Sequence, residues 1–390
     1  MIAYNKIWLT SLRLQNDVKE NQNRGYITAE EFKNIKDKYP VGFYTPGLFA
    51  RIGLFILTII VVTFADGILS LLFASASNLF DTAGWVFFLS ILSYTALEVI
   101  VSSKHHYRSG VDDALLFISA LLSGVASAML FSHYNVVYYM PVSATIFILS
   151  LYFTIRFADM LMAALCGAAL FAFIYFGWTK LVPFGIATIP FVIMLVSAGL
   201  YWGSYNLNRQ KQFAGYYNCI LIAQIIFLLG LYTAGNYYVV QTLGDNISDQ
   251  AGKPIPLGTF FWLWTMLIPL VYLGWGIFKK NTVLLRMGLV LIAAAIATFR
   301  YYYHVLPLDM VLTMGGALIL GIAYTAMRYL KTPKHGFTYA EPDTGHMMDH
   351  LKVESLIVAE TFAKVPSPPA EERSRFGGGD FGGGGSSSSY

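Results

Sequence analysis

Ten apolar stretches dominate the chain between residues 48 and 330. Each is about 17–25 residues long, the length that an α-helix needs to cross the hydrocarbon core of a bilayer. Short polar or charged segments separate them. The pattern predicts an all-α protein, a polytopic transmembrane helix bundle of ten spans at residues 48–73, 83–101, 113–132, 137–155, 160–178, 181–203, 216–235, 259–278, 283–303 and 308–330.

Three spans contain residues that interrupt a regular helix. Asp66 and Gly67 interrupt the first span, so a helix ending near Phe64 and followed by a re-entrant or interfacial segment is an alternative. Pro190 and Pro269 lie in the middle of the sixth and eighth spans, where proline removes a backbone hydrogen bond and predicts a kink.

Residues 1–47 predict a small helical hairpin ahead of the first span. Tyr4, Trp8 and Leu12 recur four residues apart, which indicates an amphipathic helix. Gly25 marks the turn. Thr28 followed by Glu31 has the form of a capping box and predicts the start of a second helix.

The C-terminal part differs in composition from the spans. Residues 331–375 are mixed and charged, with a short amphipathic helix predicted around 347–362, and residues 376–390 are a Gly/Ser-rich flexible coil. The predicted organisation is therefore a hairpin at 1–47, a bundle at 48–330, a tail at 331–375 and a disordered end at 376–390.

The composition supports lipid as the surrounding solvent. Hydrophobic residues make up 56% of the chain and charged residues only 12%, whereas soluble domains are about one quarter charged. Both cysteines, Cys166 and Cys219, fall inside apolar stretches, which excludes a disulfide framework. Nothing in the composition points to nucleic acid or to a cofactor.

The basic residues predict the orientation of the spans. Under the ten-span pattern, 23 lysines and arginines fall on the side of the two termini and 3 on the other side, namely Lys180, Lys253 and Arg300. Loops that stay in the cytoplasm retain positive charge. The sequence therefore predicts a multi-pass protein of the bacterial inner membrane with both termini in the cytoplasm.

A polar cluster is predicted on the cytoplasmic side, from the end of the second span to the start of the third. Charged groups near membrane depth cost about 3 kcal/mol each on insertion scales and are candidates for function. The cluster comprises Glu98, His105, His106, Arg108, Asp112 and Asp113.

Two interpretations of this cytoplasmic cluster compete. In the functional one, Glu98 binds a proton or cation and the histidines form a relay or a metal site. In the structural one, Asp112 and Asp113 complement the positive N-terminal end of their helix, and Glu98 pairs with Lys104 or Arg108. The structural interpretation is favoured, because two adjacent histidines are poorly placed to bind one metal ion.

A second group is predicted on the external side. Its members are Asp66, His133, Arg300, His304 and Asp309, among which an Arg300–Asp309 ion pair is expected. Gln224 is a strongly polar residue deep in the seventh span, where an interhelical hydrogen bond is expected. Motifs of nucleotide-binding loops, metalloproteases and serine hydrolases are absent from the sequence, so we predict no catalytic, cofactor-binding or metal residue.

Two features of the first 130 residues resemble a family of uncharacterised bacterial polytopic membrane proteins with an N-terminal helical hairpin. One is the pattern from Gly25 to Ile35; the other is the acidic residue near the end of the first span, Asp66. Ala65 replaces the aromatic residue that usually precedes this aspartate. The resemblance implies a membrane location but no activity or functional residue.

Three functions remain open on these grounds. We favour a non-enzymatic scaffold, assembly or envelope role, in which the hairpin and the C-terminal tail bind protein partners. A small-solute or ion transporter is the first alternative, and an intramembrane enzyme that uses the cytoplasmic cluster is the second. The bilayer is the one partner that the composition requires, and the sequence does not indicate an oligomeric state.

Overall fold

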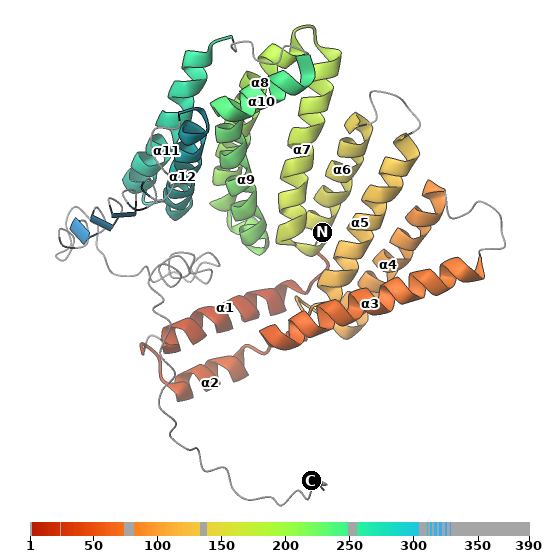
Figure 1. The fold of residues 1–390 in the computed structure, drawn as a ribbon. Coiled ribbons are helices and arrows are strands. Elements are labelled where there is room, and N and C mark those ends of the chain that lie inside the picture. Colours follow the sequence, from red (N-terminus) through yellow and green to blue (C-terminus); the bar gives the residue numbers. More distant parts are fainter. Residues whose placement is uncertain are drawn as a thin grey trace, which may run out of the picture. The chain divides into compact units, whose positions relative to one another are not determined.

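The computed structural model describes residues 2–23, 25–73, 82–132, 139–248 and 256–303, with nine separate residues between Met310 and Arg328. In these ranges the chain is all-helical (Figure 1). The helices are α1 (Lys6–Asn23), α2 (Ala29–Lys38), α3 (Leu48–Leu72), α4 (Ala83–Lys104), α5 (Val111–Phe131), α6 (Tyr139–Phe157), α7 (Met160–Leu181), α8 (Gly185–Asn208), the 3-10 helix η1 (Lys211–Tyr216), α9 (Tyr217–Gly235), α10 (Tyr237–Ser248), α11 (Gly258–Lys279) and α12 (Thr282–Tyr302).

Nine of the described helices are long and apolar enough to cross a membrane, which makes the chain a multi-pass membrane protein. They are α3 to α9, α11 and α12, and they confirm the first nine predicted spans within a few residues at most ends. Of the tenth predicted span, at 308–330, the structure describes only the nine separate residues between Met310 and Arg328, so this span stays a prediction. Helices α8 and α11 continue through Pro190 and Pro269.

Helix α3 runs without a break through Asp66 and Gly67 to Leu72, so the alternative of a helix ending near Phe64 is wrong. None of its residues is buried. The half-buried positions recur at helical spacing and form one stripe, which includes Arg51, Leu54, Phe55, Thr58, Ile59, Val62 and Asp66. Helix α3 therefore touches its neighbours along one side only.

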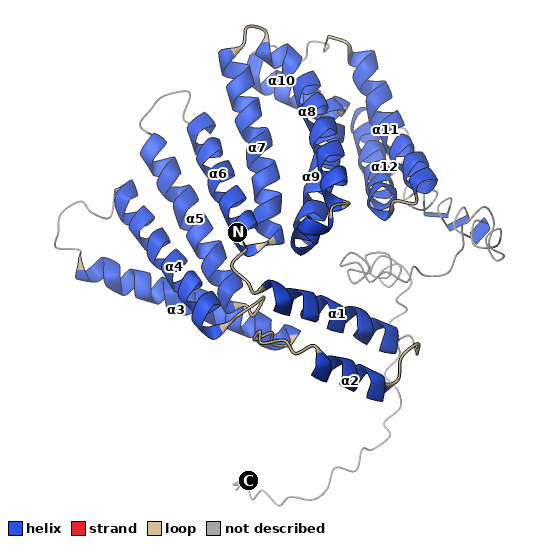
Figure 2. Cartoon of the chain, turned by 180° about the vertical axis from the view of Figure 1, so that it is seen from behind, coloured by secondary structure: helices blue, strands red, loops and turns tan. Residues whose placement is uncertain are grey.

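Consecutive helices pair as antiparallel hairpins. The most extensive contacts join α4 to α5, α6 to α7, α8 to α9 and α11 to α12. Further contacts join α5 to α6, α7 to α8 and α9, and α3 to α5. Figure 2 shows the same helices from behind.

Small polar residues hold α4 and α5 together. The Ser90 hydroxyl donates to the carbonyl oxygen of Ser119 at 2.8 Å, and the Ser119 hydroxyl donates to that of Ser90 at 3.2 Å. Helices in lipid gain little from the hydrophobic effect between them, so close approach and interhelical hydrogen bonds supply much of the packing energy.

The predicted N-terminal hairpin is present. Gly25, with φ +79°, forms the turn, and both halves of the Thr28–Glu31 capping box are made. Tyr4 does not belong to the first helix as predicted. The Asn5 side chain accepts a hydrogen bond from the Ile7 amide at 2.9 Å, so the helix begins at Lys6 and leaves Tyr4 in an arm ahead of it.

The capping box should respond to acid. The Thr28 amide and hydroxyl both donate to the Glu31 carboxylate and lower its pKa below the usual value of 4.5. The stabilisation is therefore complete above pH 4.5 and is lost as the pH falls through the lower pKa of the folded state. Amide exchange of α2 should increase in that range, and much less so in Thr28→Ala; equal acid responses in both proteins would contradict this assignment.

Helix α10 was not predicted. It lies in the segment between the seventh and eighth predicted spans and has 12 residues, too few to cross a bilayer. The side chain of Asn236 accepts a hydrogen bond from the Val239 amide at 3.2 Å and caps its start. Tyr237 stacks on Trp262 of α11, with ring centroids 4.7 Å apart.

Candidate functional site

The connection between α4 and α5 is fastened to the segment that follows α2. The Tyr44 amide donates to the carbonyl oxygen of His105 at 3.1 Å, and the Tyr107 amide donates to that of Tyr44 at 3.3 Å. These two bonds form an isolated parallel β-bridge between Tyr44 and His106. The N-terminal segment is thus bonded to the loop that contains His105 and His106.

An aromatic ring of the N-terminal segment packs against each histidine. The Trp8 ring lies 5.1 Å from that of His105 and 5.3 Å from that of Phe43, and the Tyr44 ring lies 4.9 Å from that of His106. The two pairs made by Trp8 are edge-to-face, a geometry that contributes about 1 kcal/mol for each pair beyond the area it buries. The histidines therefore help to hold the hairpin on the end of the spans.

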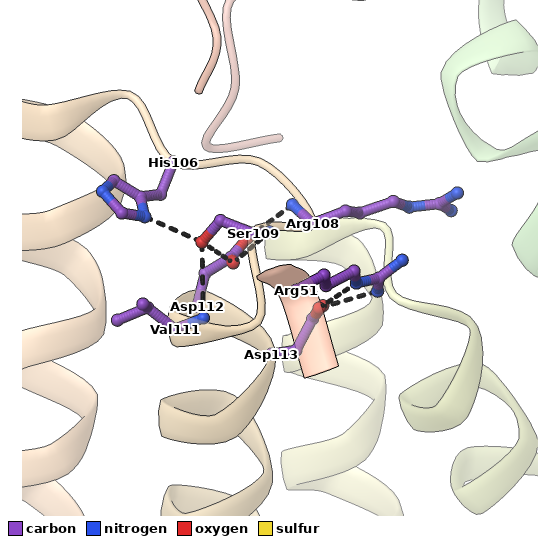
Figure 3. A network of polar contacts seen from close by, with 7 residues as sticks. All are labelled: Arg51, His106, Arg108, Ser109, Val111, Asp112 and Asp113. Atoms are coloured by element: carbon purple, nitrogen blue, oxygen red, sulfur yellow. Dashed lines mark hydrogen bonds and ion pairs between the residues drawn. The ribbon is translucent and has the colours of Figure 1, made fainter. Parts of the chain in front are cut away.

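Asp112 is the centre of a hydrogen-bond network (Figure 3). Its carboxylate accepts from the Arg108 amide at 2.7 Å, the Ser109 amide at 2.8 Å and the Ser109 hydroxyl at 2.8 Å. His106 Nδ1 lies 2.7 Å from the same hydroxyl. Because the hydroxyl donates its only proton to Asp112, Nδ1 of His106 must carry the proton that it shares with Ser109.

This network is suited to shaping the loop. In a hydrolytic triad the histidine stands between serine and aspartate and takes the proton from the serine. Here Ser109 stands between His106 and Asp112, and it is 0% exposed. The arrangement therefore holds residues 105–110 in place, including the left-handed conformations of His105 and Arg108.

Asp113 makes a different contact, with α3. Its Oδ2 atom accepts from Nε and Nη2 of Arg51 at 2.9 Å and 2.6 Å (Figure 3). Both aspartates lie in the first turn of α5, as the structural interpretation expected. The Arg51 pairing was not predicted, because the two residues are 62 positions apart and no local signal links them.

Glu98 pairs with neither Lys104 nor Arg108, so that part of the prediction is wrong. Its carboxylate accepts two hydrogen bonds from Arg156 of α6, both at 2.8 Å, and one from the Tyr94 hydroxyl at 2.6 Å. Arg156, which comes from α6, thus neutralises the Glu98 carboxylate near the end of α4. The residues of the predicted cytoplasmic cluster therefore have different partners: Asp113 binds α3, Glu98 binds α6, and the histidines contact the hairpin segment.

Only Asp66 and Arg300 of the predicted external cluster lie in the described part of the chain. His133, His304 and Asp309 lie outside the described residues, while Asp66 is half-buried in α3 and Arg300 lies in the last turn of α12. Convergence of this cluster stays a prediction. Among the residues that the structure describes, no three His, Cys, Asp or Glu side chains are close enough to hold a metal ion.

Two buried polar side chains, one in α8 and one in α9, each have an atom without a hydrogen bond among the described residues, although an interhelical bond was expected for Gln224. Gln224 is buried, but its amide nitrogen has no hydrogen-bond partner among the described residues, and neither does the hydroxyl of buried Ser197. The amide that does bond between helices is Asn236, whose nitrogen donates to the hydroxyls of Tyr232 and Thr298 at 3.1 Å each. Asn236 stands at the end of an apolar run, a position that is typical of a residue that caps a helix.

The fold and these contacts define an all-helical, multi-pass integral membrane protein whose N-terminal hairpin is bonded to the ends of its spans. Comparison with protein-family models, with curated proteins and with solved structures finds no match for this chain. The resemblance to a bacterial membrane-protein family stays a prediction.

Proposed function

We propose that this protein is a membrane-embedded scaffold that holds its N-terminal hairpin, α1 and α2, at the cytoplasmic face as a docking surface for a protein partner. The observation that carries the proposal is the way the hairpin is fastened. Several independent contacts fix it to the spans, yet α2 buries none of its residues.

The contacts that fasten the hairpin come from three connections between spans. The Ala3 amide donates to the carbonyl oxygen of Arg156 at 2.7 Å, at the end of α6. Arg13 donates to the carbonyl oxygen of Ala214 in η1 at 3.4 Å and lies over the ring of Tyr217. With the bridge at Tyr44, these contacts hold a water-soluble element in one position, as a scaffold requires.

The free side of the hairpin is polar and charged. Helix α2 packs on α1 through the half-buried residues Phe32 and Ile35, and its other side chains are exposed. Lys33, Asn34 and Lys36 are among the exposed residues. Such a surface suits a reversible contact with a partner in the cytoplasm, where the excess of basic residues predicts this end to lie.

The carboxylates of the cytoplasmic cluster already accept hydrogen bonds from other groups of the chain, which supports a scaffold over an intramembrane enzyme. Glu98, Asp112 and Asp113 are each occupied by arginine, backbone amides or Ser109. A catalytic group must instead be able to reach a substrate and exchange a proton with it.

Photo-crosslinking in native membranes tests the proposal. A photoreactive residue at Asn34 should give a discrete adduct with one partner protein, and the reversal of charge in Lys33→Glu with Lys36→Glu should abolish that adduct. A photoreactive residue at the exposed apolar Leu57 of α3 is the matched control and should label lipid. Adducts at Asn34 that consist only of this chain, or that survive charge reversal, would exclude a docking role for α2.

One specific observation favours the transporter alternative: the buried amide nitrogen of Gln224 has no hydrogen-bond partner in the part of the chain that the structure describes. A buried amide without a partner costs about 1–3 kcal/mol, which a solute contact would repay. If Gln224 serves packing alone, Gln224→Leu should leave stability unchanged or raise it and leave solute flux in proteoliposomes at the background level. Flux in the wild-type protein that disappears in a folded Gln224→Leu variant would favour transport instead.

A further inference from the structure

We propose that α10 is an interfacial helix that binds the lipid surface in the headgroup region, at the membrane face opposite to the hairpin. Helix α9 follows η1, where Arg13 of the hairpin is bonded, and its other end leads into α10. The hairpin and α10 therefore lie at opposite ends of this span. The proposal does not depend on the scaffold role.

Helix α10 lies at the level where the neighbouring spans end. Figures 1 and 2 show it crosswise at the end of α9, and it contacts α8, α9 and α11. Residues 237–244 of this helix carry no charge. A helix at this level that has an apolar side can bury that side at the boundary between headgroups and acyl chains.

One side of α10 is fixed to the neighbouring spans. The Tyr237 amide donates to the hydroxyl of Thr265 in α11 at 2.9 Å, and the Tyr238 ring lies 4.8 Å from that of Tyr301 in α12. Val240 packs against a buried apolar cluster between α8, α9 and α11. The side of Tyr237 and Val240 thus sets the position of α10 on the protein.

Another side of α10 presents apolar groups that the described part of the protein leaves uncovered. Leu243 is 41% exposed and lies one turn after half-buried Val239. Residues two apart point in nearly opposite directions on a helix, so Thr242 lies on the side turned away from Val240. The helix therefore has an apolar edge at Leu243 and a polar position beside it at Thr242.

Two further apolar side chains precede the helices that contact α10. Phe184, with φ +60°, precedes α8 and is 86% exposed, and Leu257, with φ +61°, precedes α11 and is 64% exposed. Bulky residues rarely adopt this left-handed conformation, and at these exposures neither side chain is buried by the protein. Insertion into lipid is a gain that these two side chains can make and that glycine could not supply.

Lipid is the partner that this surface fits. The surface continues into the lipid-facing sides of α11 and α12, where Leu263 and Tyr301 are 57% and 61% exposed. Tyrosine and tryptophan are typical of the boundary between membrane and water, and Tyr237 stacks on Trp262 there. The exposed apolar groups of α10 are therefore continuous with a surface that lipid already covers.

Electron paramagnetic resonance of the full chain in liposomes of phosphatidylethanolamine and phosphatidylglycerol tests the proposal. A nitroxide is attached at Leu243→Cys or at Thr242→Cys, in a variant whose Cys166 and Cys219 are replaced by alanine. At position 243 the collision rate with oxygen, which concentrates in lipid, should exceed the rate with a water-soluble nickel complex. At position 242 the order of the two rates should be reversed.

Reference positions define lipid and water in the same liposomes. Val290, 59% exposed near the middle of α12, reports the hydrocarbon core, and exposed Asn34 of α2 reports water. Labels at Phe184 and Leu257 should give the same order of rates as the label at position 243. If the chain without cysteines does not fold, a nitroxide coupled to a ketone-bearing amino acid at the same positions of the otherwise unchanged chain gives the same comparison.

Three results would overturn the proposal. A higher nickel rate at Leu243 would place this edge of α10 in water. A higher oxygen rate at Thr242 would place the whole helix inside the hydrocarbon core. Low rates with both reagents at Leu243 would show that protein, and not lipid, covers it.

Discussion

Replacing Gly110 with alanine is expected to cost about 3 kcal/mol of unfolding free energy. Gly110 caps the start of α5 with φ +93°, a conformation that L-amino acids rarely adopt. A Cβ atom at this position would collide with the backbone carbonyl oxygen of Arg51 and would lie 3.0 Å from the amide nitrogen of Phe55. Since both are backbone atoms, relief requires α3 to move away from α5.

Gly25→Ala is the matched control for this substitution. Gly25 also has a positive φ, +79°, but a Cβ atom there would meet nothing within 4 Å. Its expected cost is therefore the backbone strain alone, about 1 kcal/mol. Unfolding of both variants in detergent by titration with a denaturing detergent measures the difference; equal losses would mean that the contact between α3 and Gly110 contributes nothing.

Breaking the Glu98–Arg156 pair should have a comparable effect. Arg156→Gln leaves the Glu98 carboxylate with the Tyr94 hydroxyl as its remaining donor, and Glu98→Gln leaves the guanidinium without its carboxylate. Removing the carboxylate or guanidinium partner of a charge near membrane depth costs about 3 kcal/mol. We expect each single variant to lose roughly that much stability, measured by the same detergent titration.

The double variant distinguishes pairing from two separate roles. If the two charges stabilise the fold mainly by pairing with each other, the double variant Glu98→Gln/Arg156→Gln should lose less stability than the sum of the single losses. The coupling energy should exceed about 1 kcal/mol. Arg209→Gln is the control. Among the described residues, the Arg209 side chain forms its hydrogen bond and its cation–π contact with Tyr205 alone, so the substitution should change stability by less than about 0.5 kcal/mol. Additive losses from Glu98 and Arg156 would contradict a direct interaction.

The spans and the hairpin were predictable because their signals are local. An apolar run of sufficient length defines α4 or α7 without reference to the rest of the chain, and Thr28 with Glu31 defines the start of α2. The start of α1 was predictable too, since Asn5 is a preferred N-cap residue, but the spacing of Tyr4 and Trp8 suggested a longer helix.

The partners of the charged residues were not predictable from one sequence. Glu98 and Arg156 are 58 positions apart, and only the packing of α4 near α6 brings them together. Lys104 and Arg108 are closer along the chain, yet Lys104 lies at the end of α4 and the Arg108 side chain is directed elsewhere. Spacing along a chain reports distance in space only within one helix or one turn.

The contacts of the N-terminal segment also set an order of events during synthesis. Helix α3 is made early, but the carboxylate that binds Arg51 emerges 62 residues later, and the carbonyl that receives the Ala3 amide belongs to residue 156. The hairpin is therefore synthesised well before some of the residues that fasten it to the spans. Until α6 has been synthesised, the Ala3 amide lacks its acceptor, and an incompletely fastened segment is more accessible to chaperones and proteases than the finished fold.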